Sequence, residues 1–323
     1  MNSPASLSRR NFIKTTGLAL SAATLPATSP LRAAEATKWP AGCRDLYLKL
    51  AGQADCWSAI KALGAEGTEV LVELDLACPN LFHPQHKYTL ATADGIRALK
   101  DDLPASGSRI TAFMMSNRFD ERLEQELKAA GSLVQAAQQL GVDAIRIDVV
   151  PRKLSADQFL PFAIDACKRL CASAKGTPVR FGVENHGKIT NDPQFLDKLF
   201  DGVGSDGLSL TLDCANFYWW GMPLKDLYAV YEKFAPRVVH THCKSIRYPA
   251  DKQNVRREIG WEYNKYDCPI YEGDLDFKRI VSILRKANYR GDLCVEDESL
   301  GKYAQNERAD IIRKEIAFLK GLE

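Results

Sequence analysis

The chain has 323 residues, of which 46% are hydrophobic and 26% are charged, a composition typical of a globular protein. Its formal net charge of +2 excludes the strongly basic surface that nucleic-acid binding requires, so we expect no nucleic acid as a partner. Apolar runs stay shorter than the roughly 20 residues needed to cross a bilayer, which predicts no membrane contact once an N-terminal signal has been removed.

The first 36 residues predict a twin-arginine export signal. Arg9 and Arg10 are followed by Phe12, then by a mild apolar stretch over 17–25 and by small residues around Ala34. A disordered basic tail is the alternative interpretation, but it requires all these features to coincide. We therefore expect a periplasmic or otherwise exported protein whose mature domain covers residues 37–323.

Short apolar runs alternate with segments of helical period in the rest of the chain. Eight runs are predicted as strands, at 46–50, 69–76, 109–115, 144–150, 179–184, 208–213, 238–242 and 293–296. The amphipathic segments predict helices between them, among them 121–140, 156–173 and 306–322. Eight strand–helix units predict a single α/β domain folded as a (β/α)8 TIM barrel. An open doubly wound sheet is the alternative, although no GxGxxG follows the first predicted strand.

Four chemically distinctive residues stand at the ends of the last four predicted strands: Glu184, Asp213, His242 and Glu296. The alternation of side chains along a strand places all four toward one interior. Three carboxylates and an imidazole are suitable ligands for one divalent ion, namely Mn, Mg, Co or Zn. Because a lone buried carboxylate is costly to keep charged, the pattern predicts such an ion at the mouth of the barrel.

The connection over 247–276 is unusually long for a strand-to-helix link and is rich in aromatic residues. We interpret it as a lid or substrate loop. A polar surface insertion with a few packed aromatic residues is the alternative.

Several motifs resemble those of the xylose isomerase-like TIM barrel superfamily, also described as the sugar phosphate isomerase/epimerase family. They are VENHG at 183–187, LDCANF at 212–217, HCKS at 242–245, EGDLDF at 272–277 and NYRGDLCVEDES at 288–299. Carried over by position, the resemblance implies the same four metal ligands, with Glu184 and Glu296 also acting as catalytic acid and base. His242 is then the ligand, and His240 lies one layer deeper.

The resemblance implies a metal-dependent isomerase or epimerase. Its reaction would remove a proton next to the carbonyl of a small carbohydrate through a metal-stabilised enediolate. Export favours an unphosphorylated sugar or keto-sugar as substrate. Two alternatives stay open, a keto-glycoside lyase or hydratase/dehydratase on the same scaffold, and a periplasmic sugar-binding protein without turnover. Thr190 and Asn216 replace a Glu and a His of the family's ketose 3-epimerases, which argues against that activity.

Further residues are candidates for binding the substrate. They follow the ligand-bearing strands, face inward by alternation or lie in loops at the same end: His186, Lys188, Lys244, Arg247, Asn216, Trp219, Asp148, Asp75 and His83. The expected partner is thus a small carbohydrate, and a homo-oligomer is possible.

Overall fold

The computed structural model describes residues 38–322. The export signal expected over 1–36 lies outside these residues, so it stays a prediction, as does the start of the mature domain. Within residues 38–322, no helix combines the length and the apolar character that a membrane span needs.

Eight parallel strands close into a barrel, which confirms the predicted TIM fold and excludes the open sheet. The strands, in their order around the barrel, are β1 (Ala41–Arg44), β2 (Gly67–Leu71), β3 (Arg109–Met114), β4 (Ala144–Ile147), β5 (Arg180–Glu184), β6 (Leu208–Asp213), β7 (Val238–Cys243) and β10 (Leu293–Val295). Pairing of β1 with β10, in which Ala41 is opposite Leu293, closes the ring.

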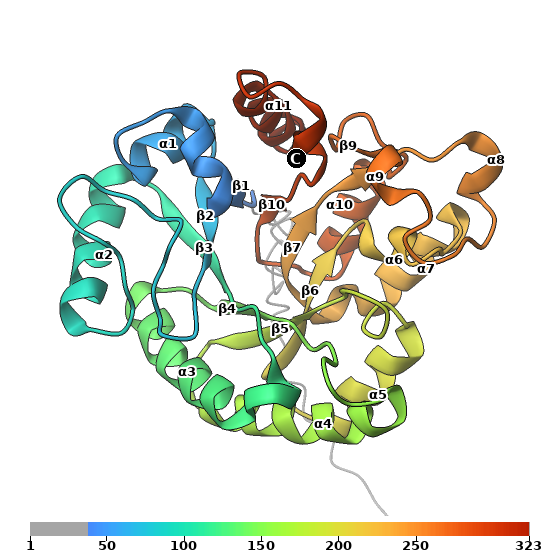
Figure 1. Ribbon diagram of the computed structural model, residues 1–323, viewed down its shortest axis with the longest axis horizontal. Coiled ribbons are helices and arrows are strands. Elements are labelled where there is room, and N and C mark those ends of the chain that lie inside the picture. Colours follow the sequence, from blue (N-terminus) through green and yellow to red (C-terminus); the bar gives the residue numbers. More distant parts are fainter. Residues whose placement is uncertain (1–37, 323) are drawn as a thin grey trace, which may run out of the picture. The chain divides into compact units, whose positions relative to one another are not determined.

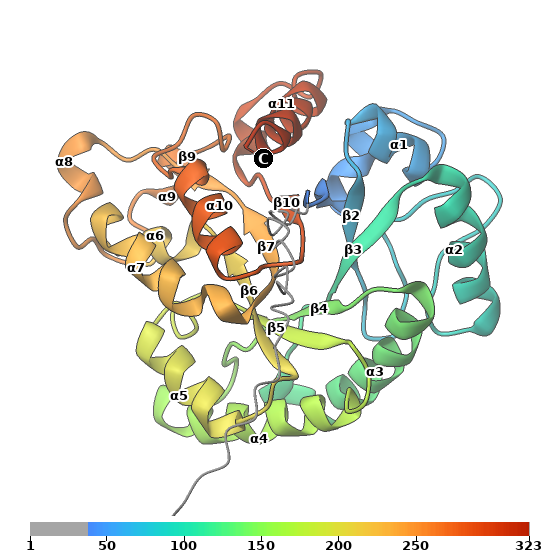
Figure 2. The same ribbon diagram turned by 180° about the vertical axis from the view of Figure 1, so that it is seen from behind.

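Helices surround the strands on all sides of the barrel (Figure 1; seen from behind in Figure 2). They are α1 (Cys56–Ala62), α2 (Ala93–Ser106), α3 (Phe119–Leu140), α4 (Ala156–Ser173), α5 (Pro193–Val203), α7 (Leu224–Phe234), α10 (Phe277–Lys286) and α11 (Arg308–Lys320). Three short 3-10 helices, η1 (Asp45–Ala51), η2 (Ala235–Arg237) and η3 (Ser299–Lys302), and the short helix α6 (Asn216–Trp219) complete the ring.

The first strand lies earlier in the chain than the apolar pattern predicts. Residues 46–50, predicted as a strand, belong to η1, in which Tyr47 and Leu48 are buried whereas Leu46 is 42% exposed. This one-sided burial is typical of a helix that packs on a surface. The true strand, with the sequence AGCR, is too short and too rich in small residues to produce an apolar run.

The long connection over 247–276 is a packed insertion. It contains α8 (Ala250–Gln253), α9 (Tyr263–Tyr266) and β9 (Asp267–Cys268), which pairs antiparallel with β8 (Ser245–Ile246). Its Arg257 is buried between the rings of Tyr218 and Tyr248, at 4.4 and 4.3 Å from their centroids. This packing of aromatic residues agrees with the alternative, a surface insertion, and the role of the segment as a lid or substrate loop stays a prediction.

Candidate metal centre

The four predicted ligands meet at the C-terminal end of the barrel. Glu184 ends β5, Asp213 ends β6, His242 lies in β7 and Glu296 directly follows β10. Each contributes a donor atom, these atoms all lie within 4.8 Å of one another, and all four residues are buried. The sequence prediction that these residues share one interior is confirmed. We call them the ligand group.

The geometry of the ligand group suits a divalent ion. Donor atoms that lie roughly 2.0–2.6 Å from a common ion must be within about 5 Å of each other, as these atoms are. Oδ1 of Asp213 accepts hydrogen bonds from the backbone N–H groups of Ala215 and Asn216, at 2.7 and 2.8 Å. Its buried Oδ2 forms an ion pair with Nζ of Lys244 and keeps lone pairs that a metal ion could use.

Three cationic side chains surround the carboxylates of the ligand group. Arg146 contacts Oε2 of Glu184 with two nitrogens, of which Nε is 2.6 Å away. Nζ of Lys244 lies 2.9 Å from Oδ2 of Asp213 and 3.3 Å from Oε2 of Glu296. The other oxygen of Glu296, Oε1, pairs with Arg44. These cations offset part of the cost of burying three negative charges together.

The neighbouring cations lower the pKa values of the carboxyl groups, whereas burial raises them. Burial alone would raise the pKa of Glu184, but Arg146 and His242 hold it well below the ordinary value. His242, Lys244 and Arg44 likewise overcome burial and lower the pKa of Glu296. For Asp213, burial prevails over Lys244 and raises the pKa to about 7. A bound cation would keep this third carboxylate ionised at neutral pH.

The imidazole of His242 contacts carboxylates on both sides. Its Nδ1 lies 3.1 Å from Oε1 of Glu184 and 3.3 Å from Oε2 of Glu296. Its Nε2 lies 3.0 and 3.1 Å from the two oxygens of Glu69. Sequence reasoning missed Glu69, whose signal is an acid at the first position of the second predicted strand, directly before the apolar residues 70–72.

Several predicted substrate-binding residues lie beside the ligand group. Lys244 contacts it directly, and Nδ2 of Asn216 donates to Oε1 of Glu184 at 3.4 Å. Nδ1 of His186 is 2.9 Å from Oδ1 of the buried Asp148, and this hydrogen bond raises the pKa of His186. The predicted inward orientation of Asp148 is therefore confirmed.

The other predicted residues lie farther out. Lys188 and Arg247 are exposed, and neither side chain contacts the ligand group. Trp219 is half-buried and lines a cavity of about 460 Å³ with residues of the packed insertion, such as Gly260 and Tyr263. His83 stacks on His86 at 4.2 Å and groups with Asp102 of α2, so the structure places it in a separate cluster.

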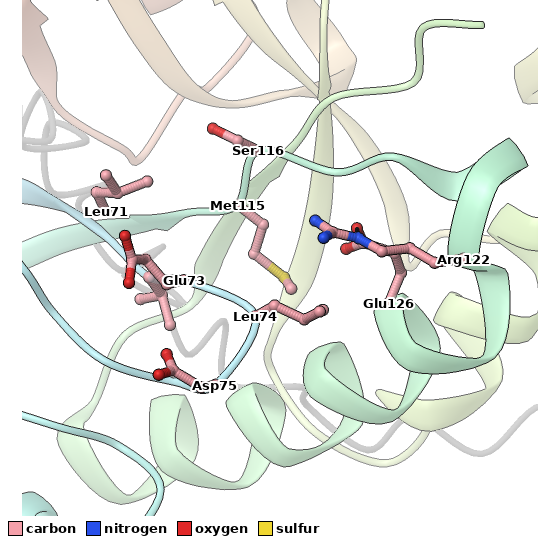
Figure 3. A pocket seen from close by; sticks show the side chains of 9 residues that line it. Leu71, Glu73, Leu74, Asp75, Met115, Ser116, Arg122 and Glu126 are labelled. Carbon is pink, nitrogen blue, oxygen red and sulfur yellow. Dashed lines mark hydrogen bonds and ion pairs between the residues drawn. The ribbon is translucent and has the colours of Figure 1, made fainter. Parts of the chain in front are cut away.

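Two cavities are lined by residues that end or follow strands of the barrel, and neither is lined by a member of the ligand group. One, of about 570 Å³, follows the ends of β2 and β3; in Figure 3, Glu73 and Asp75 lie on one side of it and Arg122 with Glu126 on the other. The second, of about 550 Å³, is lined by Arg44, which itself contacts Glu296. The second cavity therefore offers a sugar-sized space one side chain away from the Glu296 carboxylate.

A closed parallel barrel with a buried His/Asp/Glu group at its C-terminal mouth defines a TIM barrel with a metal-binding site. The chain belongs to the xylose isomerase-like TIM barrel family, whose model matches residues 57–322.

Relatives and solved structures of several kinds are similar to the chain. An inosose dehydratase from Clostridium perfringens is 28% identical over 139 residues, which are 42% of this chain and 46% of that protein. The chain thus spans about half the length of the curated relatives it matches. A Mycobacterium smegmatis xylose isomerase-like barrel in complex with magnesium superposes with a TM-score of 0.63 at 16% identity, over 88% of this chain and 97% of that one.

Two further structures share the fold. The IOLI protein with a bound zinc atom gives a TM-score of 0.61 at 14% identity, over 86% of this chain and 92% of that one. The apo form of YcjR from E. coli, a 3-keto-D-glucoside 4-epimerase, gives 0.58 at 17% identity, over 86% and 95%. At these identities the likeness establishes the fold.

Proposed function

We propose that the protein is a divalent-metal-dependent isomerase or epimerase acting on an unphosphorylated sugar or keto-sugar. The observation that carries the proposal is the convergence of Glu184 and Glu296, both held ionised by neighbouring cations, on the site that would hold the ion. Two ionised carboxylates beside one ion are the equipment needed to remove a carbon-bound proton and return it.

The ligand group would hold the ion, with Mn, Mg, Co or Zn as candidates. When bound, the ion supplies Lewis acidity that polarises the carbonyl next to the proton that leaves. Arg146 orients the Glu184 carboxylate, while Arg44 and Lys244 orient that of Glu296. One of the two carboxylates takes the proton from carbon and thereby becomes a carboxylic acid, which returns a proton to the intermediate and is ionised again.

Lys244 has a distinct role in this proposal. Burial would lower its pKa, but Asp213 and Glu296 raise it well above the ordinary value, so the side chain stays an ammonium ion. A fixed positive charge at this position stabilises the negative charge that builds up on a substrate oxygen. Lys244 is therefore an electrostatic stabiliser and not a base.

A dehydratase is the second candidate, and it is supported by the inosose dehydratases that match the chain at 28–30% identity. The first step is common to both reactions, removal of a proton next to a carbonyl. Return of a proton then gives an isomer or epimer, whereas departure of a β-oxygen gives a dehydratase or lyase product. The 3-keto-D-glucoside 4-epimerase activity named for YcjR supports the first outcome.

Nuclear magnetic resonance of keto-sugars incubated with the protein in deuterated water tests the proposal. We expect deuterium at an epimerised or isomerised carbon. Formation of an unsaturated product, without any deuterium-labelled isomer or epimer, would favour the dehydratase instead. Binding of the sugar in a calorimeter without any product would contradict both reactions and support a sugar-binding protein.

We also infer export through the twin-arginine pathway, which is what favours an unphosphorylated substrate. Replacing Arg9 and Arg10 together by lysine should leave the protein in the cytoplasmic fraction of cells that export the wild type. Equal amounts of both proteins in the periplasmic fraction would contradict the inference. The possible homo-oligomer stays a prediction.

A further inference from the structure

A file of buried polar side chains runs from the ligand group into the interior of the barrel. It contains His242, Glu69, His240 and Asp292, all at most 2% exposed. Nε2 of His242 is 3.0 Å from Oε1 of Glu69, and the same oxygen is 3.1 Å from Nε2 of His240. Nδ1 of His240 is in turn 2.6 Å from Oδ1 of Asp292. We call these four residues the buried file.

The arrangement of donors and acceptors in the buried file fixes where protons reside. A carboxylate only accepts hydrogen bonds, so each imidazole nitrogen that faces Glu69 must donate. His240 faces a carboxylate with both nitrogens and therefore carries a proton on each. His242 likewise faces carboxylates with both nitrogens, Glu69 with Nε2 and the ligand group with Nδ1. An ion bound by the ligand group would take the place of the Nδ1 proton, whereas Nε2 would keep its proton for Glu69.

We propose that Glu69 is the positioning residue of the metal centre. By accepting the Nε2 proton of His242, it selects the tautomer that presents Nδ1 to the ion and fixes the orientation of the ring. His240, anchored by Asp292, and Arg44, whose Nε is 3.3 Å from Oε2 of Glu69, hold the Glu69 carboxylate in place. This inference rests on the metal centre of the proposed function and assigns it a fifth essential side chain.

A second metal ion is the competing interpretation, because Glu69, His240 and Cys294 also have donor atoms within 4.8 Å of one another. The contacts argue against it. The oxygens of Glu69 already face two imidazoles and a guanidinium, and both nitrogens of His240 face carboxylates. The structure thus assigns one ion per chain.

Titration of Mn²⁺ into chelator-treated protein, followed by electron paramagnetic resonance, tests the role of Glu69. We expect E69A to bind Mn²⁺ about 10- to 100-fold more weakly than the wild type, as is typical when the partner of a ligating histidine is lost. E69Q keeps an acceptor oxygen and should bind with an intermediate affinity. E315Q is the matched control, because Glu315 is an equally buried acid that lies on α11, outside the barrel interior. The Mn²⁺ affinity of E315Q should equal that of the wild type.

Nitrogen-15 spectra of the histidines in Zn²⁺-loaded protein provide a readout that general destabilisation would not change. The wild type should show an exchange-protected Nε2 proton on His242, assigned by its loss in a His242→Gln variant, and E69A should lose that protection. If circular dichroism shows that E69A does not fold, E69Q is compared with the wild type in its place.

The outcomes separate this inference from the proposed function. A wild type that binds no Mn²⁺ would overturn the metal centre itself. A wild type that binds one ion, with Glu69 variants of the same affinity and the same His242 protonation, would overturn the role of Glu69 alone. Two Mn²⁺ ions per wild-type chain would establish the competing interpretation.

Discussion

Lys244 shows how a single residue can determine the charge balance of the site. Its ammonium group lies within 3.4 Å of three carboxylates, those of Asp213, Glu296 and Glu298. It adds a positive charge next to the position proposed for the ion without replacing any ligand. Its removal should therefore affect catalysis and metal binding in different ways.

We predict that K244M, which keeps most of the length of the side chain without its charge, lowers kcat by about 100-fold or more. Mn²⁺ affinity should stay equal or increase, because Asp213 and Glu296 lose a competing cation. Steady-state kinetics with the accepted keto-sugar and Mn²⁺ titration of the same preparation measure the two effects. A parallel loss of metal binding would show that Lys244 supports the fold of the site instead.

At the level of residues, the sequence allowed prediction of the four residues that converge, and of Lys244 beside them, but not of their other supporting partners. The ligand group combines a distinctive residue type with a position at the end of an apolar strand. Glu69, Arg44 and Arg146 owe their importance to contacts across the barrel, as in the approach of Glu69 to His242 over 173 positions of the chain. One-dimensional alternation does not encode which strands become neighbours.

At the level of elements, strand β1 depends on close approach of two backbones. Gly42 is paired with Gly67 of β2, and a Cβ at residue 42 would lie 2.3 Å from the Gly67 carbonyl oxygen. Gly301, in η3, has open space around the same position and no left-handed backbone. These two glycines form a matched pair for substitution.

We expect G42A to lower the free energy of unfolding by about 1–3 kcal/mol, since the clash is with backbone and cannot be relieved by a side-chain movement. G301A should stay within about 0.5 kcal/mol of the wild type. Urea denaturation followed by circular dichroism measures both. Equal stability of the two variants would mean that β1 and β2 are not in the register described.

Helix α11 carries a buried acid whose protonation is coupled to folding. Oε1 of Glu315 accepts the backbone N–H of Ile270 at 2.9 Å, while its buried Oε2 has no hydrogen-bond donor within residues 38–322. Burial, and then Asp297, raise the pKa of Glu315 well above 4.5. The folded state thus binds this proton more tightly than the unfolded state does.

The sign of the resulting pH dependence follows from linkage. The contribution of Glu315 to stability is complete below about pH 4.5, where both states are protonated, and is lost as the pH rises toward the folded-state pKa. E315Q keeps the acceptor for Ile270 without the charge, so at pH 8 it should be more stable by about 1–3 kcal/mol. Urea denaturation from pH 4.5 to 8 should show this gap closing toward low pH, and a gap that is constant with pH would contradict the assignment.

The agreement between expected and observed elements depends on how much local signal each one carries. The predicted limits of strand 208–213 and helix 156–173 are confirmed as β6 and α4, because both have a complete apolar pattern between polar or small residues. By contrast, β1 has four residues and no apolar run, and only its place between β2 and β10 makes it a strand.

On the scale of the whole molecule, the barrel brings together ligands that are separated by more than one hundred residues of chain. The ligand group draws on four strands, so an ion bound there would cross-link half of the barrel. Because such a site does not exist in the unfolded chain, binding of the ion should stabilise the fold.

We predict that Mn²⁺ at about 1,000 times its Kd raises the free energy of unfolding by about 4 kcal/mol and Tm by roughly 10 °C. Excess chelator should reverse the shift, and D213N should show little of it. Differential scanning calorimetry of the three samples measures the effect. An equal rise in Tm for D213N would indicate that the ion stabilises the protein from another site, such as the cluster of His83, His86 and Asp102.

The central claim is that a single divalent ion is held by side chains from β5, β6, β7 and the end of β10. The most direct measurement is elemental analysis of protein purified without chelator, for the wild type and for D213N. We expect close to one equivalent of a divalent metal in the wild type and a large loss of that metal in D213N. A wild type without metal after incubation with Mn²⁺, Mg²⁺, Co²⁺ and Zn²⁺, or D213N with a full equivalent, would contradict it.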